Sequence, residues 1–221
     1  MVPTVTTRTD TRRYRADLLV TAVMLLAAPA WLFVGALVVC TADDCRPGAF
    51  DLTGMALAAA GHAPLSDAVF RAVTWGGSIL VLGPLAVVHA AIMWRRLRGA
   101  GALFLPAALA GAALMAYATK SAVARARPDV APLIEIPVDA SFPSAHALQV
   151  GAFVMGWLLA PTRRAQRPGT VEIVMALLVV TLVSWSRLHL QVHYPSDILF
   201  ALAAAVIWVV ALRYVSIWSR K

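Results

Sequence analysis

Six continuous apolar stretches run through this sequence, and each approaches the length that a helix needs to cross a lipid bilayer. The hydrocarbon core of a bilayer is about 30 Å thick, which about 20 helical residues span. The fourth and fifth stretches are short, so we expect their ends to extend into the neighbouring polar segments. Continuous rather than alternating apolar character disfavours a transmembrane β-barrel. The expected spans are Leu18–Val39, Thr74–Trp94, Ala102–Thr119, Ser144–Ala160, Val171–Trp185 and Ile198–Ile217.

The composition agrees with a membrane protein. Hydrophobic residues make up 61% of the 221 residues and charged residues only 14%, whereas ordinary soluble domains contain about half and about a quarter. A soluble globule of this size exposes too much surface to hide a mean hydropathy of +0.77. The sequence therefore predicts an all-α, six-span transmembrane helical bundle. Residues 1–17 are expected to form a basic cytoplasmic tail and residues 18–221 a single membrane-embedded domain.

The positions of the charges predict the orientation. Thirteen of the 19 Lys and Arg residues, but only three of the 11 Asp and Glu residues, fall in the tails and in the loops on one side of the six spans. Short cytoplasmic loops are enriched in Lys and Arg, so we expect both termini to be cytoplasmic. This distribution also accounts for the net charge of +8 without a nucleic-acid partner. The first apolar run continues beyond an Ala28-Pro29-Ala30 site as far as Val39, which favours a retained anchor over a cleaved signal peptide.

The first outer segment contains two cysteines and a less apolar stretch. Cys40 and Cys45 flank a short acidic stretch, where a local disulfide and two unpaired thiols are both compatible with the sequence. The less apolar segment 50–72 is expected to form an interfacial helix with Ser66 as a candidate N-cap. Three polar residues of this segment are expected to be solvated or to face lipid headgroups: His62, Asp67 and Arg71.

Six cations fall on the outer side, where the other charges are mostly acidic. Four of them lie at or just beyond the ends of expected spans, which indicates an anionic ligand. Arg forks bind phosphate oxygens bidentately and Lys adds a point charge. The segment Pro143-Ser144-Ala145-His146 begins the fourth span, and a helix N-terminus there offers free backbone N–H groups to an anion. The six outer cations are Arg46, Arg71, Lys120, Arg125, Arg127 and Arg187.

The other outer segment with reactive residues joins the last two spans. His193 and Asp197 are four residues apart, a spacing at which the carboxylate can hold one imidazole nitrogen and leave the other free to attack. We interpret His189 as structural and His89 as a packing residue. Three acidic residues of the loop before Pro143 are expected to be solvated, with gating of the site as the alternative: Asp129, Glu135 and Asp139.

Together these segments resemble the three-part signature of the type-2 phosphatidic acid phosphatases, which share an active-site design with vanadium haloperoxidases. The matching segments are Lys-x6-Arg-Pro at 120–128, Pro-Ser-Ala-His at 143–146 and Ser-Arg-x5-His-x3-Asp at 186–197. The resemblance implies that His193 is a nucleophile forming a phosphohistidine, that Asp197 orients it and that His146 is the general acid. It also implies a phosphate clamp, which consists of Lys120, Arg127, Arg187, the Ser144 hydroxyl and the backbone N–H of Ala145. Arg125 is implied as an auxiliary cation. The family usually has Gly where this chain has Ala145, so we expect retained activity with an altered substrate fit.

The implied function is metal-independent hydrolysis of a lipid phosphate or diphosphate, with no cofactor. Undecaprenyl diphosphate is favoured as the substrate, and phosphatidic acid, phosphatidylglycerol phosphate and a lipid A phosphate are the other candidates. The expected partners are the lipid substrate and the membrane lipids, and the expected location is the inner (plasma) membrane with the site facing the periplasm or exterior. Alternatives are a lipid phosphotransferase, a catalytically inactive member, a haloperoxidase and a non-enzymatic anion transporter. An anion transporter places its charges near mid-membrane, whereas these charges cluster at helix ends on one side.

Overall fold

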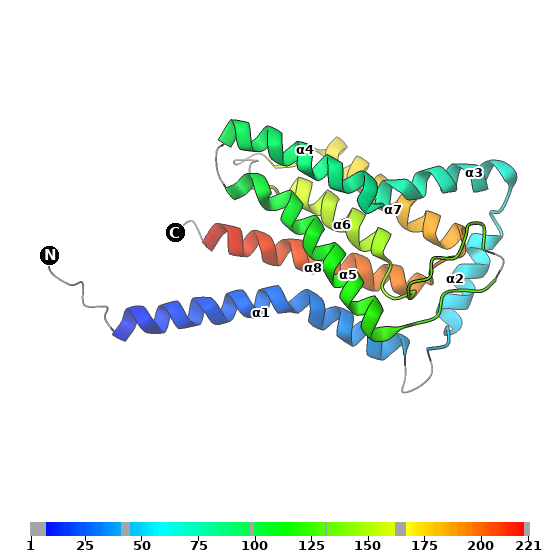
Figure 1. Ribbon diagram of the computed structural model, residues 1–221, viewed down its shortest axis with the longest axis horizontal. Helices are drawn as coiled ribbons and strands as arrows, with labels where there is room; N and C mark the ends of the chain where they lie inside the picture. Colours follow the sequence, from blue (N-terminus) through cyan, green and yellow to red (C-terminus); the bar gives the residue numbers. More distant parts are fainter. Residues whose placement is uncertain (1–7, 41–44, 98–99, 131, 162–166, 219–221) are drawn as a thin grey trace.

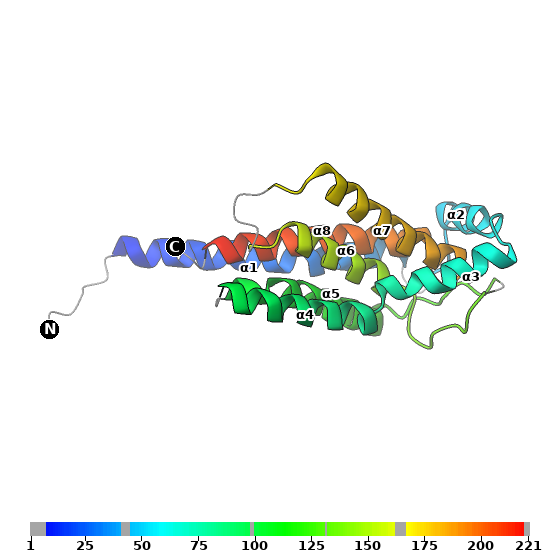
Figure 2. The same cartoon turned by 90° about the horizontal axis from the view of Figure 1, so that it is seen from above.

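The computed structural model describes residues 8–40, 45–97, 100–130, 132–161 and 167–218. Within these ranges the chain is helical and contains no β-strand, as the sequence predicts. The helices lie side by side in one bundle, except for α2 and α3, which cover one end of it (Figures 1 and 2). The α-helices are α1 Arg8–Val39, α2 Ala49–Ala59, α3 Pro64–Val73, α4 Ile79–Leu97, α5 Phe104–Val123, α6 Ala145–Leu158, α7 Thr170–His189 and α8 Pro195–Trp218. Two 3-10 helices precede α4 and α5, namely η1 Thr74–Gly77 and η2 Ala100–Leu103.

Five of these helices are long and apolar enough to cross a bilayer. They include α1, α4, α5, α7 and α8, and the chain is a multi-pass membrane protein. The helix α6 has only 14 residues, which corresponds to about 21 Å at 1.5 Å per residue. The predicted extension into polar sequence is therefore confirmed for α7, which reaches His189, and is wrong for α6, which ends at Leu158.

Small residues allow the short helix α6 to lie inside the bundle. It packs against α4, α5, α7 and α8, while α1 packs against α8. Buried alanines line the facing sides of α5, α6 and α8, and small side chains let membrane helices approach closely. By contrast, large apolar side chains of α1, α4 and α7 point outward, where lipid would cover them. Among the buried alanines are Ala108, Ala112, Ala147, Ala152, Ala201, Ala204 and Ala205.

The segment expected to form one interfacial helix forms two. The chain turns between α2 and α3, and Pro64 occupies the first turn of α3, where its missing N–H costs nothing. Ser66 is not the N-cap, because Ala63 takes that position. The Ser66 hydroxyl instead accepts a hydrogen bond from the Ala63 N–H at 3.0 Å.

The second span also begins later than the sequence predicts. Residues 74–77 form the 3-10 helix η1, and α4 starts only at Ile79, because Ser78 adopts an extended backbone conformation. The 3-10 helix presses against the start of α6. A Cβ atom on Gly77 would lie 2.9 Å from the Cβ atom of His146, so only glycine permits this approach.

The chain termini and the sequence motifs lie at opposite ends of the bundle. The first turn of α1 and the last turn of α8 lie at one end, and α2 and α3 lie at the other (Figure 1). At the end with α2, the structure joins Cys40 and Cys45 in a disulfide, which selects one of the two alternatives that the sequence left open. All three motif segments also meet at this end, below α2 and α3.

Candidate active site

The loop before α6 holds the three motif segments together. The Ser141 N–H donates to the carbonyl oxygen of Arg125 at 2.7 Å, which ties this loop to the end of α5. The Ser144 N–H donates to the carbonyl oxygen of Asp197 at 3.2 Å, which ties the start of α6 to the start of α8. The predicted site residues of all three segments are thus brought to one place.

The imidazole of His193 lies between a carboxylate and a guanidinium. Its Nδ1 is 3.3 Å from Asp197 Oδ2, and its Nε2 is 3.1 Å from Arg127 Nη1. Arginine is only a donor, so Nε2 accepts from Arg127. This assigns the His193 proton to Nδ1, from which it is donated to Asp197. The lone pair of Nε2 is therefore directed toward the cations.

The surroundings of His193 favour its neutral form. Its side chain is buried. Burial first, and then the positive charges of Arg127 and Arg187, hold the pKa of His193 well below its usual range. A neutral imidazole retains the lone pair that a nucleophile needs.

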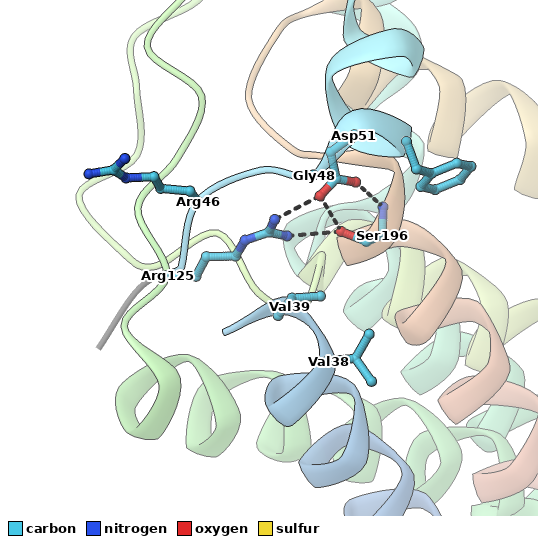
Figure 3. A pocket seen from close by; sticks show the side chains of 8 residues that line it. Val38, Val39, Arg46, Gly48, Asp51, Arg125 and Ser196 are labelled. Carbon is cyan, nitrogen blue, oxygen red and sulfur yellow. Dashed lines mark hydrogen bonds and ion pairs between the residues drawn. The ribbon is translucent and has the colours of Figure 1, made fainter. Parts of the chain in front are cut away.

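Asp197 belongs to a buried group of charges, which we call the inner cluster: Asp51, Arg125 and Asp197. Arg125 Nη1 lies 2.6 Å from Asp197 Oδ1, and Arg125 Nη2 lies 2.7 Å from Asp51 Oδ2. Figure 3 shows Arg125 directed toward Asp51 and the neighbouring Ser196. Arg125, expected as an auxiliary cation for phosphate, instead has both terminal amino groups bonded to protein carboxylates.

The remaining contacts of the inner cluster fix the carboxylate that holds His193. Asp197 Oδ2 also accepts from the Tyr194 N–H at 3.0 Å and from the Ser141 hydroxyl. The guanidinium of Arg125 lies 4.3 Å from the centroid of the Tyr194 ring, in cation–π geometry. Burial disfavours the charge of Arg125, but Asp197 and Asp51 outweigh burial and raise its pKa above the ordinary value.

Asp51 is a member of the inner cluster that the sequence analysis did not identify. It accepts hydrogen bonds from both the N–H and the hydroxyl of Ser196, at 2.9 and 2.8 Å, and so caps the start of α8. It stands on α2, 74 residues from Arg125, and belongs to none of the three motifs. Only its position in the less apolar segment before α3 distinguished it in the sequence.

A second group of charges lies at the rim of the site, and we call it the outer cluster: Lys120, Arg127 and Asp139. Asp139 Oδ2 is 3.1 Å from Lys120 Nζ, and Asp139 Oδ1 is 2.6 Å from Arg127 Nη2. Partial burial opposes the ionisation of Asp139, but Lys120 and Arg127 outweigh it and lower its pKa. Asp129, Glu135 and Asp139 are all exposed, as predicted. The sequence did not show that Asp139 also forms two ion pairs.

Two further predicted clamp residues are buried and carry unsatisfied polar atoms. Arg187 Nη1 donates to the Thr74 hydroxyl at 2.6 Å. Arg187 Nε has no hydrogen-bond partner among the described residues. The Ser144 hydroxyl, at the N-cap of α6, is buried and lacks a partner in the same ranges. Ala145 and His146 follow in the first turn of α6. Arg187 Nε and the Ser144 hydroxyl therefore have hydrogen-bonding capacity that no described protein group uses.

A comparison with protein families decides the identity of this arrangement. The family model of the PAP2 superfamily matches residues 101–221. This chain belongs to the PAP2 superfamily. The matched PAP2 region contains every site residue that the sequence predicted, whereas Asp51 lies before it.

Relatives and solved structures agree with this membership. The chain is 38% identical over 118 residues to a decaprenylphosphoryl-5-phosphoribose phosphatase of Mycolicibacterium smegmatis, and the match covers 48% of this chain and 60% of that protein. The fold is similar to that of a transmembrane PAP2-type phosphatidylglycerolphosphate phosphatase from Bacillus subtilis, with a TM-score of 0.72, 20% identity, and 88% and 96% of the two chains covered. It is also similar to that of Aquifex aeolicus LpxE, with a TM-score of 0.62, 19% identity, and 76% and 97% covered.

Proposed function

We propose that this PAP2 protein is a membrane lipid phosphatase that removes a phosphate from a lipid phosphate or diphosphate through a phosphohistidine on His193. The observation that carries this proposal is the buried His193 imidazole, whose Nδ1 lies 3.3 Å from Asp197 Oδ2 and whose Nε2 lies 3.1 Å from Arg127 Nη1. A nucleophile beside cations suits an anionic electrophile, because the cations neutralise the phosphate that the neutral nitrogen must approach.

In the first step, the non-bridging phosphate oxygens bind Lys120, Arg127 and Arg187. The Ser144 hydroxyl and the Ala145 N–H add two more donors at the start of α6. Each charge-assisted hydrogen bond contributes about 1.5–3 kcal/mol. These donors take up the negative charge of the transferring group, so no step of this mechanism requires a metal.

His193 Nε2 then attacks the phosphorus while the bond to the leaving lipid oxygen breaks. His146 donates its proton to that oxygen, and Asp197 stabilises the positive charge that develops on the His193 ring. In the second step, a water molecule attacks the phosphohistidine and His146 accepts the proton of the water. The nitrogen–phosphorus bond breaks, inorganic phosphate leaves and both histidines return to their initial state.

For the substrate, we infer a lipid phosphate with a polyprenyl chain. The family resemblance favours undecaprenyl diphosphate, and the name of the mycobacterial relative adds a polyprenyl phosphate carrying a phosphorylated sugar. Phosphatidic acid, phosphatidylglycerol phosphate and a lipid A phosphate complete the set to be tested.

We propose a topology of six spans in one domain, residues 18–221, with both termini in the cytoplasm and the site at the outer face of the inner (plasma) membrane. The distribution of Lys and Arg supports this orientation. The structure is compatible with it, because the start of α1 and the end of α8 share one end and the site lies at the other. Although α6 is short, its position inside the bundle shields it from lipid.

The experiment measures phosphate release by the purified full chain in detergent, over the lipid panel and in excess EDTA. We expect release that is lost in His193→Ala and kept in the matched control His89→Ala, whose ring packs against Trp157 on the other part of the bundle. We expect the phosphoenzyme to be trapped after an alkaline quench and to be lost after an acid quench, because phosphohistidine is hydrolysed in acid. Release that survives His193→Ala contradicts the mechanism. Phosphate transfer to an acceptor lipid indicates the phosphotransferase, and anion flux without release indicates the transporter.

A further inference from the structure

The loop before α6 supplies an anion to the cations of the proposed phosphate clamp. The Asp139 carboxylate bridges Lys120 and Arg127 through its two oxygens, at 3.1 and 2.6 Å. The carbonyl oxygen of Asp139 accepts from Arg127 Nε at 2.9 Å, and that of Ala140 accepts from Lys120 Nζ. Four oxygens of this loop thus occupy donors that the proposed mechanism assigns to phosphate.

Asp139 is able to leave this position. Its side chain is 50% exposed, whereas the side chains of Lys120 and Arg127 are 7% and 6% exposed. Residues 139 and 140 also lie outside regular secondary structure. The two cations are therefore held by the bundle, while the carboxylate that covers them stands on a solvent-facing loop.

We propose that Asp139 competes with phosphate for the clamp. Its carboxylate binds Lys120 and Arg127 before the substrate arrives, and the substrate phosphate displaces it. This inference rests on the proposed function. A lipid phosphate gains additional binding from its chain, whereas inorganic phosphate depends on the clamp alone. Displacing Asp139 costs the substrate and the free product the same free energy. The lipid chain sustains the binding of the substrate, whereas the binding of inorganic phosphate becomes weak, so Asp139 limits inhibition by the product.

The test compares Asp139→Asn with wild type in the full chain in detergent. We expect the inhibition constants of inorganic phosphate and orthovanadate to fall by about tenfold or more, with a comparable fall in KM and no increase in kcat. Glu135→Gln is the matched control, since it removes one negative charge from an exposed position of the same loop. Asp139→Glu keeps the charge and should retain weak phosphate binding.

The outcomes separate this inference from the proposed function. Unchanged inhibition constants in Asp139→Asn, with an active wild type, overturn the role of Asp139 and leave the phosphatase intact. An equal change in Glu135→Gln also overturns it, because a general charge effect would then explain the result. If wild type neither binds orthovanadate nor releases phosphate from any lipid, it is the proposed function that fails.

A different cluster, away from both ion-pair groups, combines two imidazoles and a carboxylate: His62, Asp67 and His189. One potential ligand atom of each residue lies within 4.8 Å of the other two. His189 Nε2 is 2.8 Å from Asp67 Oδ1, and His62 Nε2 is 2.8 Å from the carbonyl oxygen of His189. These residues come from the turn after α2, the first turn of α3 and the end of α7, so the expectation that His62 and Asp67 are merely solvated is wrong.

The contacts of this cluster match the surroundings of metal-binding histidines. A carbonyl oxygen only accepts, so His62 carries its proton on Nε2 and keeps the lone pair on Nδ1. Metal-ligating histidines usually donate their second N–H to such a carbonyl or carboxylate. His189 is buried between the rings of His62 and Phe70, with centroids 4.7 and 4.5 Å away, which holds its ring in place beside Asp67.

We infer that His62, Asp67 and His189 bind one divalent ion of the zinc class and tie α3 to the end of α7. Two imidazoles and one carboxylate suit Zn²⁺ and Co²⁺. The ligand atoms of a tetrahedral Zn²⁺ ion lie roughly 3.3 Å apart, so small side-chain rotations close the site. The ion takes the place of the proton between His189 Nε2 and Asp67, and the neutral His189 ring then holds its proton on Nδ1.

The test titrates the full chain in detergent, after removal of metals by a chelator, with Co²⁺ alone. We expect a visible absorption band that saturates at one ion per chain and disappears when Zn²⁺ is added. His62→Ala and Asp67→Asn should each weaken Co²⁺ binding at least tenfold, while the control His89→Ala should leave it unchanged. Absorption that is unaffected in His62→Ala, that is lost in His193→Ala, or that never develops overturns this site.

Discussion

The inner and outer clusters are built from the same chemistry, and they differ in the exposure of their carboxylates. Each contains two contacts between a carboxylate and a cation, at distances between 2.6 and 3.1 Å. The carboxylates of the inner cluster, Asp51 and Asp197, are 5% and 0% exposed, whereas Asp139 of the outer cluster is half exposed. The buried charges of the inner cluster must therefore stay paired, whereas the Asp139 carboxylate of the outer cluster can be exchanged for another anion.

The energetic consequence follows from desolvation. Removing one partner of a buried ion pair costs about 3–5 kcal/mol, because the other charge remains buried without compensation. An ion pair with a half-exposed carboxylate contributes less, because water already solvates part of that carboxylate. The inner cluster is therefore committed to positioning His193, and the cations of the outer cluster remain available to a ligand.

The largest expected effect comes from the residue that joins the inner cluster to the nucleophile. Asp197→Asn removes the charge that stabilises the His193 cation and allows the wrong tautomer, so we expect kcat to fall by about 10³–10⁴-fold. Single-turnover formation of the phosphoenzyme measures this step directly. Retention of a tenth or more of the wild-type rate would show that the inner cluster does not position His193.

Stability should distinguish the two clusters most clearly. Asp51→Asn leaves Arg125 with one carboxylate, and we expect the free energy of unfolding to fall by about 3–5 kcal/mol. Asp139→Asn makes the same chemical change at the outer cluster, and we expect a smaller loss, because the half-exposed Asp139 is only partly desolvated. Denaturant unfolding of both variants in the same detergent is the measurement. Equal losses would contradict the distinction that burial predicts.

The pH dependence should report the influence of the outer cations on His193. Because the pKa of His193 is lowered, the nucleophile stays neutral and active below pH 6.5 and is lost only when pH falls through that lowered pKa. Lys120 contributes to the lowered pKa of His193, so in Lys120→Gln the acidic limb should move to higher pH. An acidic limb that stays in place in Lys120→Gln would contradict this influence of the outer cations on His193.

The smallest effect is expected at the position where this chain departs from the family pattern. Ala145→Gly removes a methyl group beside the backbone N–H that is proposed to bind phosphate, and the backbone gains room to approach the ligand. We expect KM to change by less than about threefold and kcat to stay the same, since the N–H itself is kept. Steady-state kinetics over the lipid panel measures both, and a large gain in kcat would identify Ala145 as an inhibitory substitution.

The sequence predicted the parts of the fold and site that depend on local properties. Apolar length identified the helices of the bundle, and the charge and proline of the polar segments marked the helix ends where the site lies. Spacing along the chain placed His193 four residues from Asp197, and the structure confirms that the two side chains are in contact. Helix boundaries were less well predicted at Thr74, where the backbone conformation depends on the packing of η1 against the start of α6, and at the end of α6.

What only the tertiary structure decided is the choice of partner for each charge. Arg125 and Arg127 are two residues apart and have the same side chain, yet one is enclosed between Asp51 and Asp197 and the other lies beside His193 and the half-exposed Asp139. Asp51 comes from a helix distant in sequence, and Asp139 from a loop without a repeating pattern. Hydropathy and residue spacing determine which helices form and which residues are neighbours along the chain. The strength and the role of an ion pair depend on burial and on distance in space, and both arise only when the helices pack.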